Sequence, residues 1–272
     1  MRPRTAATSE DGWANSSAFL AGRTVGDLLE AGGFIVAWEP AMIAVRSGAA
    51  VQAGNRLEGY YADPRPEIAA LVPVSARRVL DVGCGYGALG ELLKARGHEV
   101  SGVELVPEAA THARRFLDRV EVADVETDGM PFAAGSFDAI ILADVLEHLI
   151  DPWQVAKQAA ELLAPGGCVI ASVPNVQNID VLRRLVRGRW DYRERGILDR
   201  GHLRFFTVRT LRRMLEEAGL RVTRTVPHYR RTWRRSLANL MTFGRASAFL
   251  ARRHLVVAER GFPIDHRSPE RE

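Results

Sequence analysis

The segment VLDVGCGYG at residues 79–87 decides the fold of this chain: it has the pattern of a buried strand that carries Asp81 and then breaks into alternating glycines. A helical pattern follows at once and runs to Arg96. Glycine tolerates positive φ and lets a ligand approach the backbone closely. The N–H groups at the start of the next helix have no partner within the helix and would point at such a ligand. The segment therefore predicts a ligand site at the turn after the first strand of a sheet.

Strand and helix patterns alternate from Arg77 onward, which predicts an α/β fold with a parallel sheet and helices on both of its faces. Two later strand patterns predict an antiparallel hairpin at the edge of this sheet. The expected strands are 78–83, 99–105, 119–123, 137–143, 168–173, 221–225 and 255–258, and the expected helices are 87–96, 107–117, 152–163 and 208–218.

The 272 residues suffice for one large domain with additions. Residues 1–18 are polar and small, and we expect them to be disordered. Residues 19–75 form an N-terminal accessory segment, and 76–260 form the main domain. Within that domain, residues 176–206 do not fit the alternation, and we interpret them as an inserted cover over the carboxyl end of the sheet. Residues 261–272 are a polar, flexible tail.

Several features predict a cytoplasmic protein. No run of 18 apolar residues occurs, which argues against a transmembrane helix. The first 15 residues lack the apolar middle of a signal peptide. The two cysteines, Cys84 and Cys168, both fall in elements that we expect to be buried, so a disulfide framework is not expected and a reducing compartment fits.

Arginine supplies all but two of the 37 basic residues, although the net charge is only +4. Coding bias in a GC-rich genome is the preferred explanation, but the arginine-rich surface after residue 180 could also meet an anionic partner such as a phosphate, a nucleotide sugar or an anionic membrane surface. No RNA-recognition or helix-turn-helix signature accompanies the arginines, so we expect no nucleic-acid partner. The two densest clusters are Arg183, Arg184, Arg187, Arg189, Arg193 and Arg195, and then Arg230, Arg231, Arg234 and Arg235.

Three acids distinguish between the ligands that a glycine turn can hold. The G-x-G-x-x-G match at 85–90 alone is weak evidence for a dinucleotide. Asp81 would repel a pyrophosphate and suits an ammonium group instead. Glu104, at the end of the second strand, can accept from two ribose hydroxyls, and Asp124, after the third strand, can accept from an adenine amine. Ammonium, ribose and adenine together describe S-adenosylmethionine better than NAD.

The segments VLDVGCGYG, VSGVEL, VEVADVE, FDAIILADVLEHL and LLAPGGCVIASVPN resemble the ordered motifs of class I S-adenosylmethionine-dependent methyltransferases, over roughly residues 77–260. The resemblance implies a Rossmann-like, seven-stranded, mostly parallel sheet whose last strand is antiparallel. It also implies that Asp81 positions the methionine end of S-adenosyl-L-methionine, that Glu104 binds the ribose and that Asp124 binds the adenine. Further cofactor contacts are expected at Gly83, Cys84, Gly85, Gly87, Leu105, Val125 and Ala143.

Methyl transfer from a sulfonium is an in-line displacement, and positioning alone can contribute up to about 7–11 kcal/mol. A general base adds roughly 10²–10⁴-fold for a hydroxyl acceptor. The candidate bases are His148, in DVLEH after the fourth strand, and His202, at the end of the cover; either could instead be a packed or helix-capping histidine. Asp144, Glu147 and His148 could also bind a divalent cation, because quinone O-methyltransferases have a similar E-x-x-E-H pattern that carries magnesium. We rank this below the base and expect no metal.

The segment from Asp180 to Thr207, which contains RWDYRERGILDRGHLRFFT, resembles bacterial methyltransferases found with glycosyltransferases in surface-polysaccharide or glycan clusters. This implies a small-molecule or glycan acceptor with a sugar hydroxyl, and the arginines would suit an anionic one. Alternatives are O-methylation of a quinone precursor or another phenol, and a non-catalytic module that binds S-adenosylmethionine. A nucleic-acid methyltransferase is disfavoured because the Asn/Asp-Pro-Pro-aromatic element of amino-methylating enzymes is missing.

Overall fold

The computed structural model describes residues 63–229, 239–242 and 246–260. All of these residues belong to one compact unit. The expectations of a disordered N-terminus, of most of the accessory segment and of a flexible tail lie outside the described residues, as does the arginine cluster at 230–235. The domain limits drawn from the sequence therefore remain predictions. Among the described residues, no helix is both long enough and apolar enough to cross a membrane.

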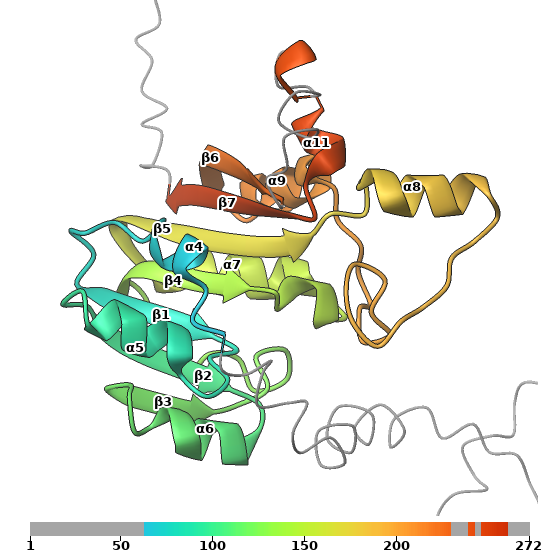
Figure 1. Cartoon of the computed structure of the whole chain (residues 1–272). Helices are drawn as coiled ribbons and strands as arrows, with labels where there is room; N and C mark the ends of the chain where they lie inside the picture. Colours follow the sequence, from blue (N-terminus) through green and yellow to red (C-terminus); the bar gives the residue numbers. More distant parts are fainter. Residues whose placement is uncertain (1–62, 230–238, 243–245, 261–272) are drawn as a thin grey trace, which may run out of the picture. The chain divides into compact units, whose positions relative to one another are not determined.

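A seven-stranded sheet forms the centre of the described structure, with strand order β3-β2-β1-β4-β5-β7-β6 (Figure 1). The pairs from β3 to β5 are parallel, whereas β7 runs antiparallel to both of its neighbours. This confirms the predicted fold class. The strands are β1 (Arg78–Val82), β2 (Glu99–Glu104), β3 (Arg119–Val122), β4 (Phe137–Ala143), β5 (Leu163–Pro174), β6 (Leu220–His228) and β7 (Arg253–Arg260).

Helices cover both faces of the sheet, as the alternating pattern predicted. One hydrophobic cluster joins Val79 of β1 to helices α4, α5 and α6, and a second joins Leu142 of β4 to α7 and α9. Central strands buried on both faces account for the continuous apolar run in β4. The helical elements are α4 (Pro66–Ala69), α5 (Ala88–Lys94), α6 (Pro107–Ala113), the 3₁₀ turn η1 (Leu146–His148), α7 (Pro152–Leu162), α8 (Ile179–Val186), α9 (Val208–Glu217) and α11 (Ser247–Leu250).

Strand β5 begins earlier than the sequence predicted. Leu163 already pairs with Phe137 of β4, and the pairing resumes at Cys168, opposite Ala139. Residues 164–167 form an irregularity inside the strand rather than a turn that precedes it. Gly166 has φ of 78°, which is the left-handed conformation that makes such a bulge possible.

Residues 176–206 lie beyond the carboxyl end of β5, and α8 extends away from the sheet there (Figure 1). Two buried asparagines fasten the start of this segment. The side-chain amide of Asn175 donates to the carbonyl oxygens of Ala248 and Ala251, at 2.8 and 2.9 Å, and that of Asn178 donates to Ala251 at 2.8 Å. Because buried amides left unpaired are costly, these bonds fix the segment against the chain that leads into β7.

Candidate functional site

The turn after β1 requires glycine at alternate positions. Gly83, Gly85 and Gly87 have φ of 70°, 55° and 86°, a region that other residues rarely adopt. A Cβ on Gly83 would also lie 2.9 Å from a methyl carbon of Val145. The N–H of Gly83 donates to the carbonyl of Val103 at 2.8 Å, which ties the turn to β2. The turn is therefore a fixed, bare stretch of backbone at the carboxyl edge of the sheet.

Asp81 lies beside this turn, and only 3% of its surface is exposed. Burial raises the pKa of its carboxyl group to about 7, the nearby charge of Glu104 adds to the increase, and the guanidinium of Arg65 opposes it. A buried acid in this state gains from a cationic group that replaces the lost water. Asp81 lines a pocket with room for about 70 Å³, so such a group could reach it.

Glu104 supports the glycine turn from β2. Its two carboxylate oxygens accept from the N–H groups of Gly85 and Val106, at 2.8 and 3.0 Å. Burial raises the pKa of Glu104, while these backbone hydrogen bonds pull it back down. A carboxylate oxygen has two lone pairs, so Glu104 can still accept from hydroxyl groups while it holds the turn.

Asp124 follows β3 and organises its own loop. Its carboxylate accepts from the N–H of Glu126 at 3.0 Å, and its own N–H donates to the carboxylate of Asp128 at 3.0 Å.

The pocket beside Asp81 is lined by only part of the residues that the sequence predicted to contact the cofactor. Asp81, Gly83, Cys84, Gly85 and Ala143 line the pocket, whereas Gly87, Glu104, Leu105, Asp124 and Val125 do not.

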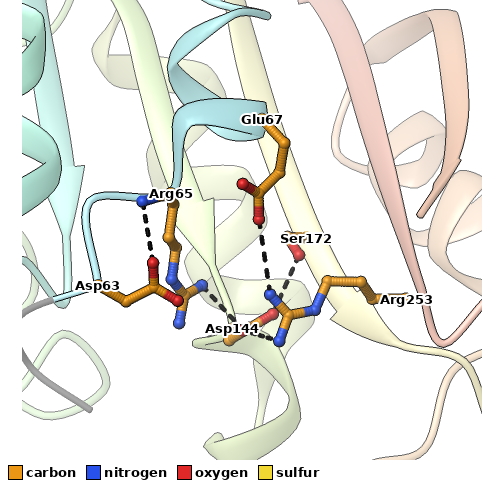
Figure 2. A network of polar contacts seen from close by, with 6 residues as sticks. All are labelled: Asp63, Arg65, Glu67, Asp144, Ser172 and Arg253. Carbon is orange, nitrogen blue, oxygen red and sulfur yellow. Dashed lines mark hydrogen bonds and ion pairs between the residues drawn. The ribbon is translucent and has the colours of Figure 1, made fainter. Parts of the chain in front are cut away.

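Arg65 and Asp144 also line this pocket. They meet in a network of polar contacts that the sequence did not indicate (Figure 2). A guanidinium nitrogen of Arg65 lies 2.8 Å from the carboxylate of Asp144, which also pairs with Arg253 at 3.2 Å and accepts from the Ser172 hydroxyl at 3.0 Å. Both Arg65 and Asp144 have positive φ, of 44° and 55°. A residue before proline is ordinarily extended, so nothing at Arg65-Pro66 announces this conformation.

The structure brings together His148 and His202, which lie far apart in the sequence; we call them the histidine pair. Their ring centroids are 4.9 Å apart. The carbonyl of Glu147, in η1, accepts from the N–H groups of Leu203 and Arg204 at 2.8 and 3.0 Å, and this pins the end of the segment 176–206 against η1. Backbone hydrogen bonds therefore create the pair.

Hydrogen bonds also set the tautomer of both rings. Nδ1 of His148 contacts the carbonyl of Gly201 at 2.9 Å, and Nδ1 of His202 contacts that of Ile197 at 3.0 Å. A carbonyl can only accept, so each Nδ1 carries the proton and each Nε2 of the neutral ring carries a lone pair. Burial, and then the neighbouring His202, lower the pKa of His148. Its ring is thus in the neutral form that a base requires.

Glu147 lies next to the histidine pair and is 1% exposed. Within the part of the chain that the structure describes, neither of its carboxylate oxygens has a hydrogen-bond partner. Burial raises its pKa well above the usual range, and the charge of Asp144 adds to this. Ligand atoms of Glu147, His148 and His202 lie within 4.8 Å of one another, a set that several divalent cations accept. The carboxylate of Asp144 is held by Arg65 and Arg253 instead.

The sequence profile of the family described as "Methyltransferase domain" matches residues 54–225, well over half of the chain. The chain belongs to this methyltransferase family. S-adenosylmethionine is the cofactor that the methyltransferase family and fold imply, and the residues present fit it. The buried carboxylate of Asp81 suits its ammonium group, and Glu104 offers lone pairs for ribose hydroxyls beside bare glycine backbone.

Curated relatives of this methyltransferase include proteins named ubiquinone biosynthesis O-methyltransferase. The one from Psychrobacter arcticus is 32% identical over 156 residues, which cover 54% of this chain and 60% of the relative. The one from Xanthomonas campestris pv. campestris is 37% identical over 113 residues, covering 40% of this chain and 47% of the relative. This chain thus spans only about half of the length of those two relatives.

Solved structures share the methyltransferase fold at low sequence identity. A putative methyltransferase of Haloferax volcanii, in complex with the Trm112 activator, has a TM-score of 0.57 at 19% identity, covering 79% of this chain and 96% of its own. A methyltransferase of Thermotoga maritima, described as a possible histamine N-methyltransferase, has a TM-score of 0.57 at 18% identity, covering 81% and 99%. These likenesses concern the fold alone.

Proposed function

We propose that this methyltransferase transfers the methyl group of S-adenosylmethionine to a hydroxyl group of a small acceptor, with a sugar or glycan hydroxyl as the leading class. The observation that carries the proposal is the histidine pair, with both Nδ1 protons committed to backbone carbonyls. His148 lies in η1, the element after β4, and the last residue of β4, Ala143, lines the same pocket as Asp81. A base there would stand near the methyl group of a bound donor.

The bound cofactor supplies an electrophilic methyl carbon on a sulfonium. Asp81 then holds the ammonium group, Glu104 accepts from the ribose hydroxyls, and Asp124 accepts from the adenine amine. Nε2 of His202 or His148 takes the proton of the acceptor hydroxyl as the oxygen attacks. The base contributes roughly 10²–10⁴-fold, and positioning of donor and acceptor contributes the larger share.

Glu147 assists the histidine pair in this scheme. Burial raises the pKa of its carboxyl group, which favours the neutral form. When an imidazole gains a proton, the new positive charge favours the ionised form of a carboxyl group a few ångströms away. Glu147 can therefore stabilise the imidazolium that forms during transfer without holding a buried charge beforehand.

O-methylation of a phenolic quinone precursor is the second candidate function. The names of the relatives from Psychrobacter arcticus and Xanthomonas campestris favour it. Those matches cover 60% or less of each relative, so the acceptor of those proteins is not carried over with the fold. A substrate panel that contains both catechols and sugars distinguishes the two candidate functions.

The test is a labelled-methyl transfer screen over free sugars, sugar phosphates, nucleotide sugars and catechols, combined with variants. On the accepted substrate, His202→Ala or His148→Ala should lower kcat by roughly 10²-fold or more while S-adenosylhomocysteine binding stays unchanged. The matched control is His228→Ala, an exposed histidine at the end of β6. Full activity in both single variants and in their double variant would contradict the base assignment. If the protein binds NAD but does not bind S-adenosylmethionine, the cofactor assignment is wrong.

A further inference from the structure

A second pocket, with room for about 150 Å³, lies in the segment that follows β5. Its wall combines three stretches of chain: α8, the loop at 193–198 and Arg252, which directly precedes β7. Four arginines stand around it, and Val181 and Leu198 supply apolar surface. We call it the arginine pocket; its arginines are Arg184, Arg193, Arg195 and Arg252, and its one acid is Asp180.

Hydrogen bonds hold the three stretches in place. The buried Asn178 precedes α8 and donates to the carbonyl of Ala251, next to Arg252, at 2.8 Å. The loop closes on itself, because the N–H of Arg193 donates to the carbonyl of Leu198 at 2.8 Å. The guanidinium groups are therefore mounted on a fixed frame rather than on a free loop.

The wall of this pocket carries four arginines and one acid. Asp180, the acid on its wall, lies 3.7 Å from Arg183, which is outside the pocket. Among the described residues, no ion pair involves Arg184, Arg193 or Arg252. Exposed arginines elsewhere behave differently: on α9, Arg212 and Arg213 pair with Glu216 and Glu217, one turn away. Coding bias alone does not explain why three arginines that take part in no ion pair with the described residues line one pocket.

We propose that the arginine pocket binds a phosphoryl group on the methyl acceptor, which rests on the function proposed above. Guanidinium groups match phosphate oxygens in planar, forked hydrogen bonds. A carboxylate presents two oxygens and one charge, which a single arginine satisfies. A phosphoryl dianion presents three oxygens, and arginines from three directions suit it better.

The same loop joins this pocket to the histidine pair. Ile197 and Leu198 line the arginine pocket, and the carbonyl of Ile197 accepts from Nδ1 of His202 at 3.0 Å. A phosphoryl group bound on one side of the loop therefore holds an acceptor hydroxyl near the ring on the other side. Acceptors of this class include sugar phosphates, nucleotide sugars and diphosphate-linked glycans.

Calorimetry of the full chain tests the pocket without any turnover. Inorganic phosphate and pyrophosphate are titrated at constant ionic strength into wild type, Arg184→Gln/Arg252→Gln and the control Arg212→Gln/Arg213→Gln, which removes the same charge from α9. We expect the first variant to bind pyrophosphate at least tenfold more weakly and the control to match wild type. The pocket assignment is overturned if wild type binds neither anion or if both variants lose affinity equally. S-adenosylhomocysteine affinity, unchanged in both variants, shows that each is folded.

Kinetics then tests the link to the acceptor, with a sugar 1-phosphate and the matching free sugar as probes. For the phosphorylated acceptor, Arg184→Gln/Arg252→Gln should raise KM at least tenfold and leave kcat near the wild-type value. For the free sugar, it should change neither. Anion binding without any preference for the phosphorylated acceptor would overturn the acceptor assignment. Absence of methyl transfer from every acceptor, with anion binding intact, would instead contradict the proposed function.

Discussion

We expect the substitution Asp81→Asn to make the cofactor-free protein more stable while weakening cofactor binding. The pKa of Asp81 is raised from 3.8 to about 7, mainly because burial removes water from the carboxylate. Between these values the folded state keeps a proton that the unfolded chain has lost, so this group's contribution to stability falls as pH rises through the window. The full penalty above about pH 7 is roughly 4 kcal/mol, at 1.36 kcal/mol per pK unit.

Asparagine carries no charge at any pH and avoids that penalty. Denaturant unfolding should show a small advantage of Asp81→Asn near pH 4 that grows by roughly 4 kcal/mol toward pH 8. Affinity for S-adenosylmethionine should fall about ten- to a hundredfold, because one charged hydrogen bond to the ammonium is lost. Binding to wild type near pH 6 should also release a proton from Asp81, which calorimetry in buffers of different ionisation enthalpy detects.

The opposite pattern would refute this reasoning. The reasoning fails if the stability of Asp81→Asn relative to wild type decreases as pH rises, or if it is the same at all pH values. Either result would mean that burial of the charge is not what distinguishes the two side chains. If cofactor affinity is unchanged, Asp81 does not contact the ammonium group. The conservative Asp81→Glu supplies the control, because it retains the charge and should retain the pH trend of wild type.

Three other perturbations follow from the site. A Cβ at Gly102 would meet Sγ of Cys84 at 2.6 Å, so Gly102→Ala should lower the unfolding free energy by about 1–3 kcal/mol, and adding Cys84→Ala should restore part of it. Asp144→Asn removes the carboxylate charge that pairs with Arg65 and Arg253 and should cost up to about 3 kcal/mol, whereas Glu217→Gln, in an exposed pair, should cost less than about 1 kcal/mol in the same assay. EDTA followed by dialysis should leave the methyl-transfer rate unchanged; a loss that added Mn²⁺ or Mg²⁺ reverses would reassign the histidine pair from base to metal ligand.

Local patterns were sufficient for the sheet and for the glycine turn. Burial on both faces makes the central parallel strands continuously apolar, and the left-handed φ at Gly83, Gly85 and Gly87 requires a residue type that is visible in the sequence. The same holds for Asp81, which is encoded one residue before the end of its strand. These features depend on neighbours along the chain, so reading along the chain finds them.

Other features depend on contacts between distant segments. Arg65 reaches Asp144 only because α4 packs on the sheet, and its left-handed backbone before Pro66 contradicts the local preference. The sequence indicates His148 and His202 as two separate candidate bases. Their proximity comes from backbone hydrogen bonds between η1 and the end of the segment 176–206. The early start of β5 differs from the expected start at residue 168 because the left-handed Gly166 allows a bulge inside the strand.

The asparagine anchors have a consequence for how far the functional unit extends. The family profile ends at residue 225, yet Asn175 and Asn178 are completed by carbonyls at 248 and 251. A chain cut after residue 225 would keep the glycine turn and the histidine pair in its sequence. It would leave the side-chain amides of Asn175 and Asn178 without these acceptors. It would also remove β7 from between β5 and β6. The start of the segment 176–206 is thus anchored by residues just before β7, so the smallest active piece should extend at least to residue 260.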